Sequence, residues 1–401
     1  MINLEKLPST RTGWVLSNGF RPLFTLVVLQ ALLALAGWLA FLNGWVKAPA
    51  SMLSPLLWHG HEMLFGFVGA AIGGFLLAAV ANWTGRKPVS GMPLVLLGGC
   101  WLLARAVALW GGQWSPLFNA AGATSYWLLL ACVFGRELIL AGNRRNLKVV
   151  VILGMFALLS VSFHLEWLPG LTVMHLCMVL IWVLLTLIGG RITPAFTRNW
   201  LNRQAEGQVR LPATQGRVDV AVSLLTPVAG MVWAFWPQSR LGAMLLMLAG
   251  ALQLVRLARW HGWQTWREPL LWALHLGYAW LGVGLLLLSG SMLGLWSSGA
   301  GIHALTVGAM GGMIMAVASR AALGHTGRAL EAGKRLLLAF VCLHLAAMLR
   351  VTASLWPAAA DALIDLSGLI WILAFGLFAW RYLPILLGPS ISFSERLKAQ
   401  R

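Results

Sequence analysis

Residues 58–86 read WHGHEMLFGFVGAAIGGFLLAAVANWTGR, an almost unbroken apolar run between two histidines and a closing arginine. A helix needs about 20 mostly apolar residues to cross a bilayer, so this run is long enough to span one. The whole chain has the same character, since 59% of its 401 residues are hydrophobic and 10% are charged. A soluble domain has about 45–50% apolar and about 25% charged residues. The composition therefore excludes a soluble protein and predicts an integral membrane protein.

Glycine, proline and charged residues divide the chain into twelve apolar segments. We expect membrane spans near 20–42, 58–82, 91–110, 116–136, 147–167, 171–193, 218–237, 240–259, 269–290, 301–323, 335–356 and 361–383. The connections are short, which predicts an all-α polytopic membrane protein with 12 transmembrane helices in a single integral domain, 1–401. The longest connection, 194–217, is polar and rich in arginine, and we expect it to lie along the membrane surface.

Lysine and arginine residues indicate the orientation of the chain in the membrane. The formal net charge is +18, which by itself would also suit a nucleic-acid-binding protein. However, all but four of the 29 Lys and Arg residues fall on the side of the predicted spans that holds both termini. Cytoplasmic loops carry such an excess. The pattern therefore predicts cytoplasmic termini, with the lipid bilayer rather than nucleic acid as the partner of the positive charge.

The four exceptions are of two kinds. Lys47 and Arg240 fall on the opposite side of the predicted spans, whereas Arg105 and Arg350 lie inside spans. Each of these intramembrane arginines comes five or six residues before a tryptophan that marks the outer end of its span. An arginine inside a membrane usually faces a partner or a polar cavity. The alternative is that both side chains extend to the outer headgroups.

Residues 301–328, GIHALTVGAMGGMIMAVASRAALGHTGR, repeat the pattern of residues 58–86. In each segment a histidine, His61 or His303, is followed 25 residues later by the arginine of a Thr-Gly-Arg sequence. The next span in each case carries the intramembrane arginine. His175 opens a weaker third copy. Parallel copies of this kind predict three four-helix units, 1–146, 147–260 and 261–401, around a pseudo-axis along the membrane normal.

Five of the nine histidines are predicted to lie at one outer depth, namely His59, His61, His164, His175 and His303. Intramembrane ionisable residues are candidates for function, and imidazole suits iron, copper and zinc. As repeat mates at matched depth, His61 and His303 are candidate haem ligands, together or one each. Arg105 and Arg350, on the following spans, are candidate partners of haem propionates.

A second metal site is predicted from the spacing of the first two histidines. Side chains two residues apart on a regular helix diverge by about 200°, so His59 points away from His61. We expect His59 to join His175, and His344 from somewhat deeper, in a copper site. The alternative is that these histidines only form hydrogen bonds with backbone or water. The glycines that follow His61 and His303 allow either close helix packing or room for a flat macrocycle.

The sequences HGHE (59–62), RITPAFTRN (191–199) and GHTGR (324–328) resemble the NnrS family, and the resemblance covers essentially the whole chain. It implies a twelve-span bacterial inner-membrane protein that contains haem and copper and is linked to nitric oxide metabolism and relief of nitrosative stress. No CxxCH sequence is present, so a b-type haem is expected rather than a c-type haem.

A second likeness is architectural. Histidines on the second, sixth and tenth spans are similar to those of the haem-copper oxidase main subunit, in which spans 2 and 10 hold the low-spin haem. By position, His61 and His303 match those two ligands. The seventh span has no histidine, and Val179 stands where that family has a tyrosine. Four-electron oxygen reduction is therefore not expected.

Three functions follow from these features. The first is a haem and copper protein that binds or turns over nitric oxide or a related small molecule, which would make it an oxidoreductase served by an unidentified electron donor. The second is a histidine-lined transporter for a metal ion or a haem-related species. The third is a structural or assembly factor without its own cofactor.

Overall fold

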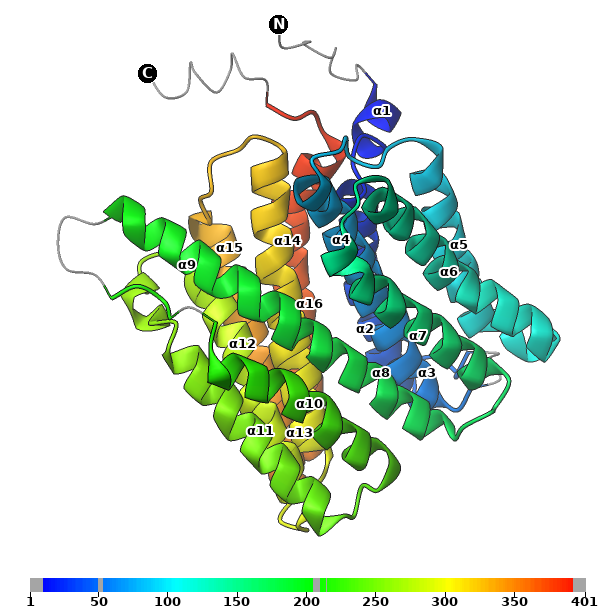
Figure 1. Cartoon of the computed structure of the whole chain (residues 1–401). Coiled ribbons are helices and arrows are strands. Elements are labelled where there is room, and N and C mark those ends of the chain that lie inside the picture. The colour runs from blue at the N-terminus through cyan, green and yellow to red at the C-terminus, as the bar shows by residue number, and fades with distance from the viewer. Residues whose placement is uncertain (1–9, 50–52, 205–209, 214, 392–401) are drawn as a thin grey trace, which may run out of the picture. The chain divides into compact units, whose positions relative to one another are not determined.

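The computed structural model describes residues 10–49, 53–204, 210–213 and 215–391. These residues form helices and no strand (Figure 1). Twelve helices among them are long and apolar enough to cross a membrane, which confirms the predicted fold class and number of spans. The predicted cytoplasmic termini fall on 1–9 and 392–401, outside the described residues.

Six of the spans are single helices, whereas six are built from two or three helical segments. The single-helix spans are α2 (Phe20–Leu42), α6 (Pro116–Leu140), α10 (Arg217–Phe235), α11 (Arg240–Ala258), α12 (Pro269–Met292) and α15 (Gly333–Leu355). The remaining spans are α3–η1–α4 (Pro55–His61, Glu62–Val68, Gly69–Thr84), α5–η2 (Met92–Trp110, Gly111–Gln113), η3–α7 (Arg144–Asn146, Leu147–His164), α8–η4–α9 (Gly170–Leu184, Leu185–Gly189, Gly190–Gln204), α13–η6–α14 (Gly299–His303, Ala304–Gly311, Gly312–His325) and η7–α16 (Pro357–Ala359, Ala360–Leu387). Two short helices, α1 (Arg11–Val15) and η5 (Gly262–Thr265), lie outside the spans.

The sixth span is longer than predicted, because α9 continues it without a break to Gln204 (Figure 1). Residues 194–204, predicted to lie in a connection along the membrane surface, are therefore helical. One face of α9 is buried and anchored. The Thr197 hydroxyl donates to the Thr193 carbonyl at 2.9 Å and lies 2.8 Å from Nε2 of His275. These contacts hold the helix beyond the point where its apolar sequence ends.

The chain divides into two compact units. Unit 1 comprises Met1–Met174, Ala318–Leu330 and Phe378–Arg401, and unit 2 comprises His175–Val317 and Glu331–Leu377. In unit 1, α6 packs between α5 and α7, and α2 packs on α4 and η1. In unit 2, α11 packs between α10 and α12, and η6 contacts both α12 and α15. The predicted division into three repeat units stays a prediction.

Two spans change to a π-helix directly after a candidate histidine. His61 ends α3 and η1 begins at Glu62, whereas His303 ends α13 and η6 begins at Ala304. π-helical turns are rare and are frequent at functional sites. The Thr-Gly-Arg sequences at the other ends of these two spans also share a backbone conformation. Their glycines, Gly85 (φ 68°) and Gly327 (φ 74°), both lie in the left-handed region. The two segments that match in sequence thus match in local backbone structure.

The glycine-rich faces of these two spans are covered by neighbouring side chains. In unit 1, a Cβ on Gly66 would collide with Arg105 and Gln30, and one on Gly69 would press on Trp127. In unit 2, a Cβ on Gly308 would collide with Trp280, and one on Gly311 would collide with Trp371. The glycines therefore serve close helix packing, and a flat macrocycle does not lie directly against these four glycines.

A first prediction concerns packing in unit 2. A Cβ on Gly301 of α13 would lie 2.6 Å from the backbone nitrogen of Leu288 in α12, where no side chain can move aside. We expect Gly301→Ala to cost about 1–3 kcal/mol, as overpacking of a core does. The melting temperature of the purified protein in detergent should fall by several degrees. The matched control is Gly376→Ala in α16, whose Cβ would meet nothing within 4 Å. Equal melting temperatures for the two variants would contradict this contact.

Candidate functional site

His61 lies at the end of α3 in unit 1 and is 1% exposed. Its Nδ1 is 3.0 Å from Oε1 of Glu62, the first residue of the π-helix. The imidazole ring packs against two phenylalanines, with centroid distances of 4.9 Å to Phe65 and 5.3 Å to Phe163. An apolar wall therefore surrounds the ring except where the carboxylate meets it.

Glu62 connects His61 to the intramembrane arginine. Its Oε2 accepts a hydrogen bond from Nε2 of Gln30 at 2.9 Å and lies 3.4 Å from Nε of Arg105. Arg105 is 7% exposed, and its guanidinium lies over the ring of Trp101 at 5.2 Å. The arginine thus faces a buried carboxylate and does not extend to the headgroups. The pair leaves no net charge, which lowers the cost of burying both groups.

His164, at the end of α7, completes the arrangement in unit 1. It is 1% exposed, and its Nδ1 lies 2.9 Å from the carbonyl oxygen of Ser160, one turn earlier. Its ring centroid is 5.4 Å from that of His61, with 84° between the two ring planes. Two buried imidazoles from α3 and α7 therefore stand next to each other.

The hydrogen bonds assign the same tautomer to both rings. A carboxylate and a backbone carbonyl only accept hydrogen bonds, so Nδ1 of His61 and of His164 must carry the proton. The Nε2 atom of each ring then presents a lone pair. Both Nε2 atoms are buried without a hydrogen-bond partner. Buried polar atoms are usually satisfied, and a histidine held through Nδ1–H with Nε2 free is the arrangement of a metal ligand.

This donor set suits a transition-metal ion. Imidazole binds copper, iron and zinc. Metal–imidazole bonds are about 2 Å long, so rings whose centres are 5.4 Å apart are close enough to share one ion. No group of three or more His, Cys, Asp or Glu side chains able to hold a metal is found among the described residues. The pair thus offers two imidazole donors, and the phenylalanines packed around it fit a single ion better than a macrocycle.

The histidines predicted to form a copper site have other contacts. His59 stacks on Trp38 in unit 1, at 4.5 Å and 18°. In unit 2, His175 packs on Trp233 at 4.0 Å and forms a hydrogen bond with the backbone of Ala234. A shared site of His59 and His175 stays a prediction, for which these ring contacts give no support.

His344 has the opposite tautomer from His61. Its Nδ1 accepts a hydrogen bond from Nε1 of Trp280 at 3.2 Å. A tryptophan indole only donates, so Nε2 of His344 carries the proton and offers no lone pair. Although this Nε2 is buried and unpaired like that of His61, it is a donor and not a ligand. The tautomer argues against the predicted role of His344 at a metal.

His303 and Arg350 lie on two helices of unit 2, α13 and α15, that contact each other. Nδ1 of His303 is 2.8 Å from the carbonyl of Gly299, so its Nε2 has the ligand tautomer. Nη1 of Arg350 is 3.1 Å from Oγ of Ser354, and that hydroxyl would lie 2.8 Å from a Cβ on Gly299. The candidate haem ligand and the candidate propionate partner therefore flank one contact between α13 and α15.

Two site residues carried weak signals in the sequence. His164 belongs to the five histidines predicted at one depth, but it has no repeat mate. Glu62 directly follows His61 in HGHE, yet nothing local indicates that Arg105, 43 positions later, would be its partner. The sequence shows both residues as ionisable groups within or near spans. Their contacts with His61 and Arg105 arise only from the packing of α3, α5 and α7.

The fold and the site define a class of protein, a polytopic helical membrane protein with a buried pair of imidazole donors from two of its spans. A comparison with family models extends this result. The model described as NnrS protein matches residues 14–390, nearly the whole chain. The chain therefore belongs to the NnrS family, as its sequence motifs predicted. No curated protein matches the chain.

Proposed function

We propose that this chain is a haem- and copper-containing protein of the bacterial inner membrane, with cytoplasmic termini, that binds or turns over nitric oxide. Family membership supports a nitric-oxide-related metalloprotein of the membrane. The observation that carries the proposal is the pair of buried, unpaired Nε2 lone pairs on His61 and His164. Buried polar atoms usually have a hydrogen-bond partner, so two adjacent unpaired Nε2 atoms favour a ligand role over a packing role.

In this proposal the residues of unit 1 hold copper. His61 and His164 are the ligands through Nε2, and the ion would supply one-electron chemistry when bound. Glu62 keeps His61 in the tautomer with Nδ1–H and holds the ring in place. Arg105 balances the Glu62 charge, so that only the metal adds charge to the site. Partners of this kind determine the orientation of a ligand ring and its basicity.

The surroundings of the site favour a small uncharged substrate. Phe65 and Phe163 line the imidazole of His61, and both are buried in a span. A large polar molecule would lose its hydration on entering such a site without compensation. Nitric oxide is a neutral diatomic molecule that dissolves in the bilayer and loses little on entry. The apolar lining therefore favours nitric oxide over a large polar substrate.

Haem belongs to unit 2 in this proposal, with His303 as a ligand and Arg350 as the partner of a propionate. We expect His303→Ala to abolish or shift the Soret band while the copper content stays within about a factor of two, because copper is held elsewhere. Gly299→Ala is not a suitable control, since it disturbs the same helix contact. Instead, His261→Ala, in the loop before α12, should leave both readings unchanged. A Soret band identical in His303→Ala and the unmodified protein would remove this haem assignment.

The proposed function is tested on the purified, unmodified chain by optical spectroscopy and metal analysis. We expect a Soret band with reduced-state bands, about one copper per chain, and a spectral change when nitric oxide is added without oxygen. A colourless protein that takes up metal ions across vesicles would instead support a transporter. A colourless protein without metal or uptake would overturn the proposal in favour of a structural role.

A further inference from the structure

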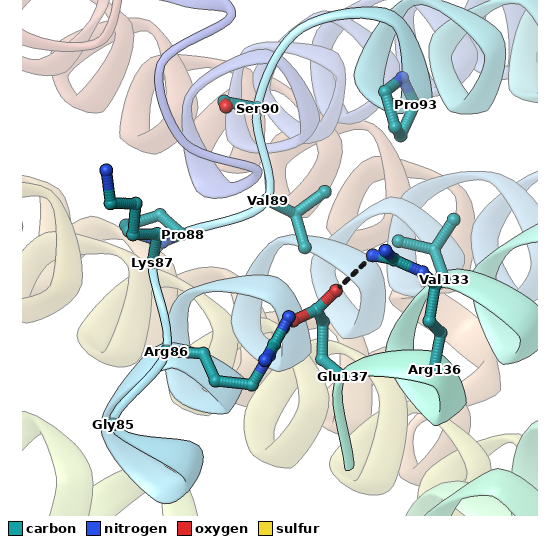
Figure 2. A pocket seen from close by; sticks show the side chains of 10 residues that line it. All are labelled: Gly85, Arg86, Lys87, Pro88, Val89, Ser90, Pro93, Val133, Arg136 and Glu137. Atoms are coloured by element: carbon teal, nitrogen blue, oxygen red, sulfur yellow. Dashed lines mark hydrogen bonds and ion pairs between the residues drawn. The ribbon is translucent and has the colours of Figure 1, made fainter. Parts of the chain in front are cut away.

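Unit 1 has a pocket of 740 Å³ away from the histidine site. It lies where the loop between α4 and α5 passes the end of α6 (Figure 2). The loop is fixed at both ends, because Gly85 and Gly91 take left-handed conformations and Gly91 N–H donates to the Leu16 carbonyl at 2.9 Å. The pocket is therefore a built feature of the loop.

The charged lining of this pocket is cationic. Glu137 accepts hydrogen bonds from Nε of Arg86 at 2.6 Å and from Nη1 of Arg136 at 2.7 Å. Figure 2 marks the bond with Arg136 by a dashed line. Lys87 adds a third cation, so the lining carries three positive charges against one negative charge. Each guanidinium has five N–H donors, and Glu137 occupies few of them. Both arginines line the pocket, and their side chains are partly exposed.

The rest of the lining is mostly apolar, with Gly85 and the polar Ser90 beside four apolar side chains. Pro88, Val89, Pro93 and Val133 complete the wall. Next to it, Met92 of α5 and Ile139 of α6 are well exposed on helices that cross the membrane. The pocket thus combines phosphate-binding side chains with an apolar flank that continues onto the surface facing lipid. It also lies at the ends of the spans where the sequence collects most of its Lys and Arg.

We propose that this pocket binds the headgroup of an anionic phospholipid. The phosphate lies against Arg86, Lys87 and Arg136, and the glycerol and upper acyl chain lie along Val133 and Pro93. Arginine binds phosphate oxygens through paired N–H donors, and basic pockets between transmembrane helices recognise anionic headgroups. The apolar flank distinguishes a lipid from free phosphate, which would contact only the cations.

The test measures lipid binding to the full chain in detergent by native mass spectrometry. We expect phosphatidylglycerol to bind at least tenfold more tightly than phosphatidylcholine. Lys87→Glu, which leaves both arginines on Glu137, should weaken phosphatidylglycerol binding about tenfold. The matched control is Lys148→Glu, an exposed lysine at the start of α7, which should change it less than twofold.

One further variant and a competition experiment test the lipid site. Arg136→Gln should reproduce the loss caused by Lys87→Glu, and inorganic phosphate at millimolar concentration should not displace the lipid. Equal weakening by Lys87→Glu and Lys148→Glu would show only general attraction to positive charge and would overturn the site. Displacement by phosphate would identify a free-phosphate site and would overturn the lipid assignment.

Discussion

Replacing either His61 or His164 with alanine is expected to lower the copper content of the purified protein at least tenfold. Each variant removes one of the two imidazoles whose Nε2 lone pairs are buried and unpaired. The remaining single imidazole is too weak a donor set to retain the ion through purification, since copper sites need two or more such ligands. The measurement is metal analysis per chain after purification, with protein quantity and monodispersity as the check on folding.

Four further variants make this result specific. His344→Ala removes a histidine that is also buried. Its Nδ1 accepts the hydrogen bond from Trp280, so its Nε2 carries the proton and cannot bind the ion, and the copper content should not change. Glu62→Gln keeps an acceptor for Nδ1–H but loses the charge, and we expect copper affinity to fall about 10–100-fold, as for other partners of metal ligands. Loss of copper in His59→Ala and His175→Ala, with normal copper in His61→Ala and His164→Ala, would refute the site and favour the pair of His59 and His175.

The spans could be predicted from the sequence because membrane insertion depends on length and apolar character, which are local properties. The same holds for the Thr-Gly-Arg ends, where Gly85 and Gly327 have the left-handed conformation that glycine adopts most readily. The end of α9 could not be predicted in this way. Its last residues are polar, and the helix persists because the buried Thr197 contacts His275, 78 positions later.

The residue types of the candidate site could be predicted from the sequence, but the contacts between these residues could not. His61 and Arg105 were identified because ionisable groups are rare within spans. Their connection through Glu62, and the approach of His164 to His61, depend on how α3, α5 and α7 face each other. The tautomers depend on a further layer of detail, namely whether each Nδ1 meets an acceptor, as in His61, or a donor, as in His344. Sequence spacing carries no information on that partner.

Arg256 is the clearest case of a residue whose sequence context conceals its role. By sequence it is one of many cations at the inner ends of spans. In unit 2 it is 2% exposed, and its Nε donates to Oδ1 of Asp219 at 2.7 Å. Its Nη1 donates to the Thr186 carbonyl in the π-helix η4 at 2.7 Å and to the Tyr278 hydroxyl at 2.9 Å. One guanidinium thus holds α10, η4 and α12 together.

Arg256→Leu is therefore expected to destabilise the protein by about 3–5 kcal/mol, the usual cost of leaving one partner of a buried ion pair alone. The Asp219 carboxylate would lose its closest cation, and the Thr186 carbonyl and Tyr278 hydroxyl would each lose a donor. We expect a fall of about 10 °C or more in the melting temperature, since about 1 kcal/mol corresponds to about 2–4 °C for units of this size. The measurement is thermal unfolding in detergent, alongside the yield of monodisperse protein.

Arg259→Leu is the matched control, because Arg259 lies one turn later on the same helix end and also faces Asp219. Its Nη1 is 3.5 Å from Oδ2, and its side chain is 33% exposed. Water replaces such a partner at little cost, so the loss should be at most about 1 kcal/mol. Arg256→Lys keeps the charge but offers a single ammonium in place of a guanidinium that reaches three acceptors, and it should fall between the two leucine variants. If Arg256→Leu and Arg259→Leu melted at the same temperature, burial and the shared contacts of Arg256 could not be what stabilises unit 2.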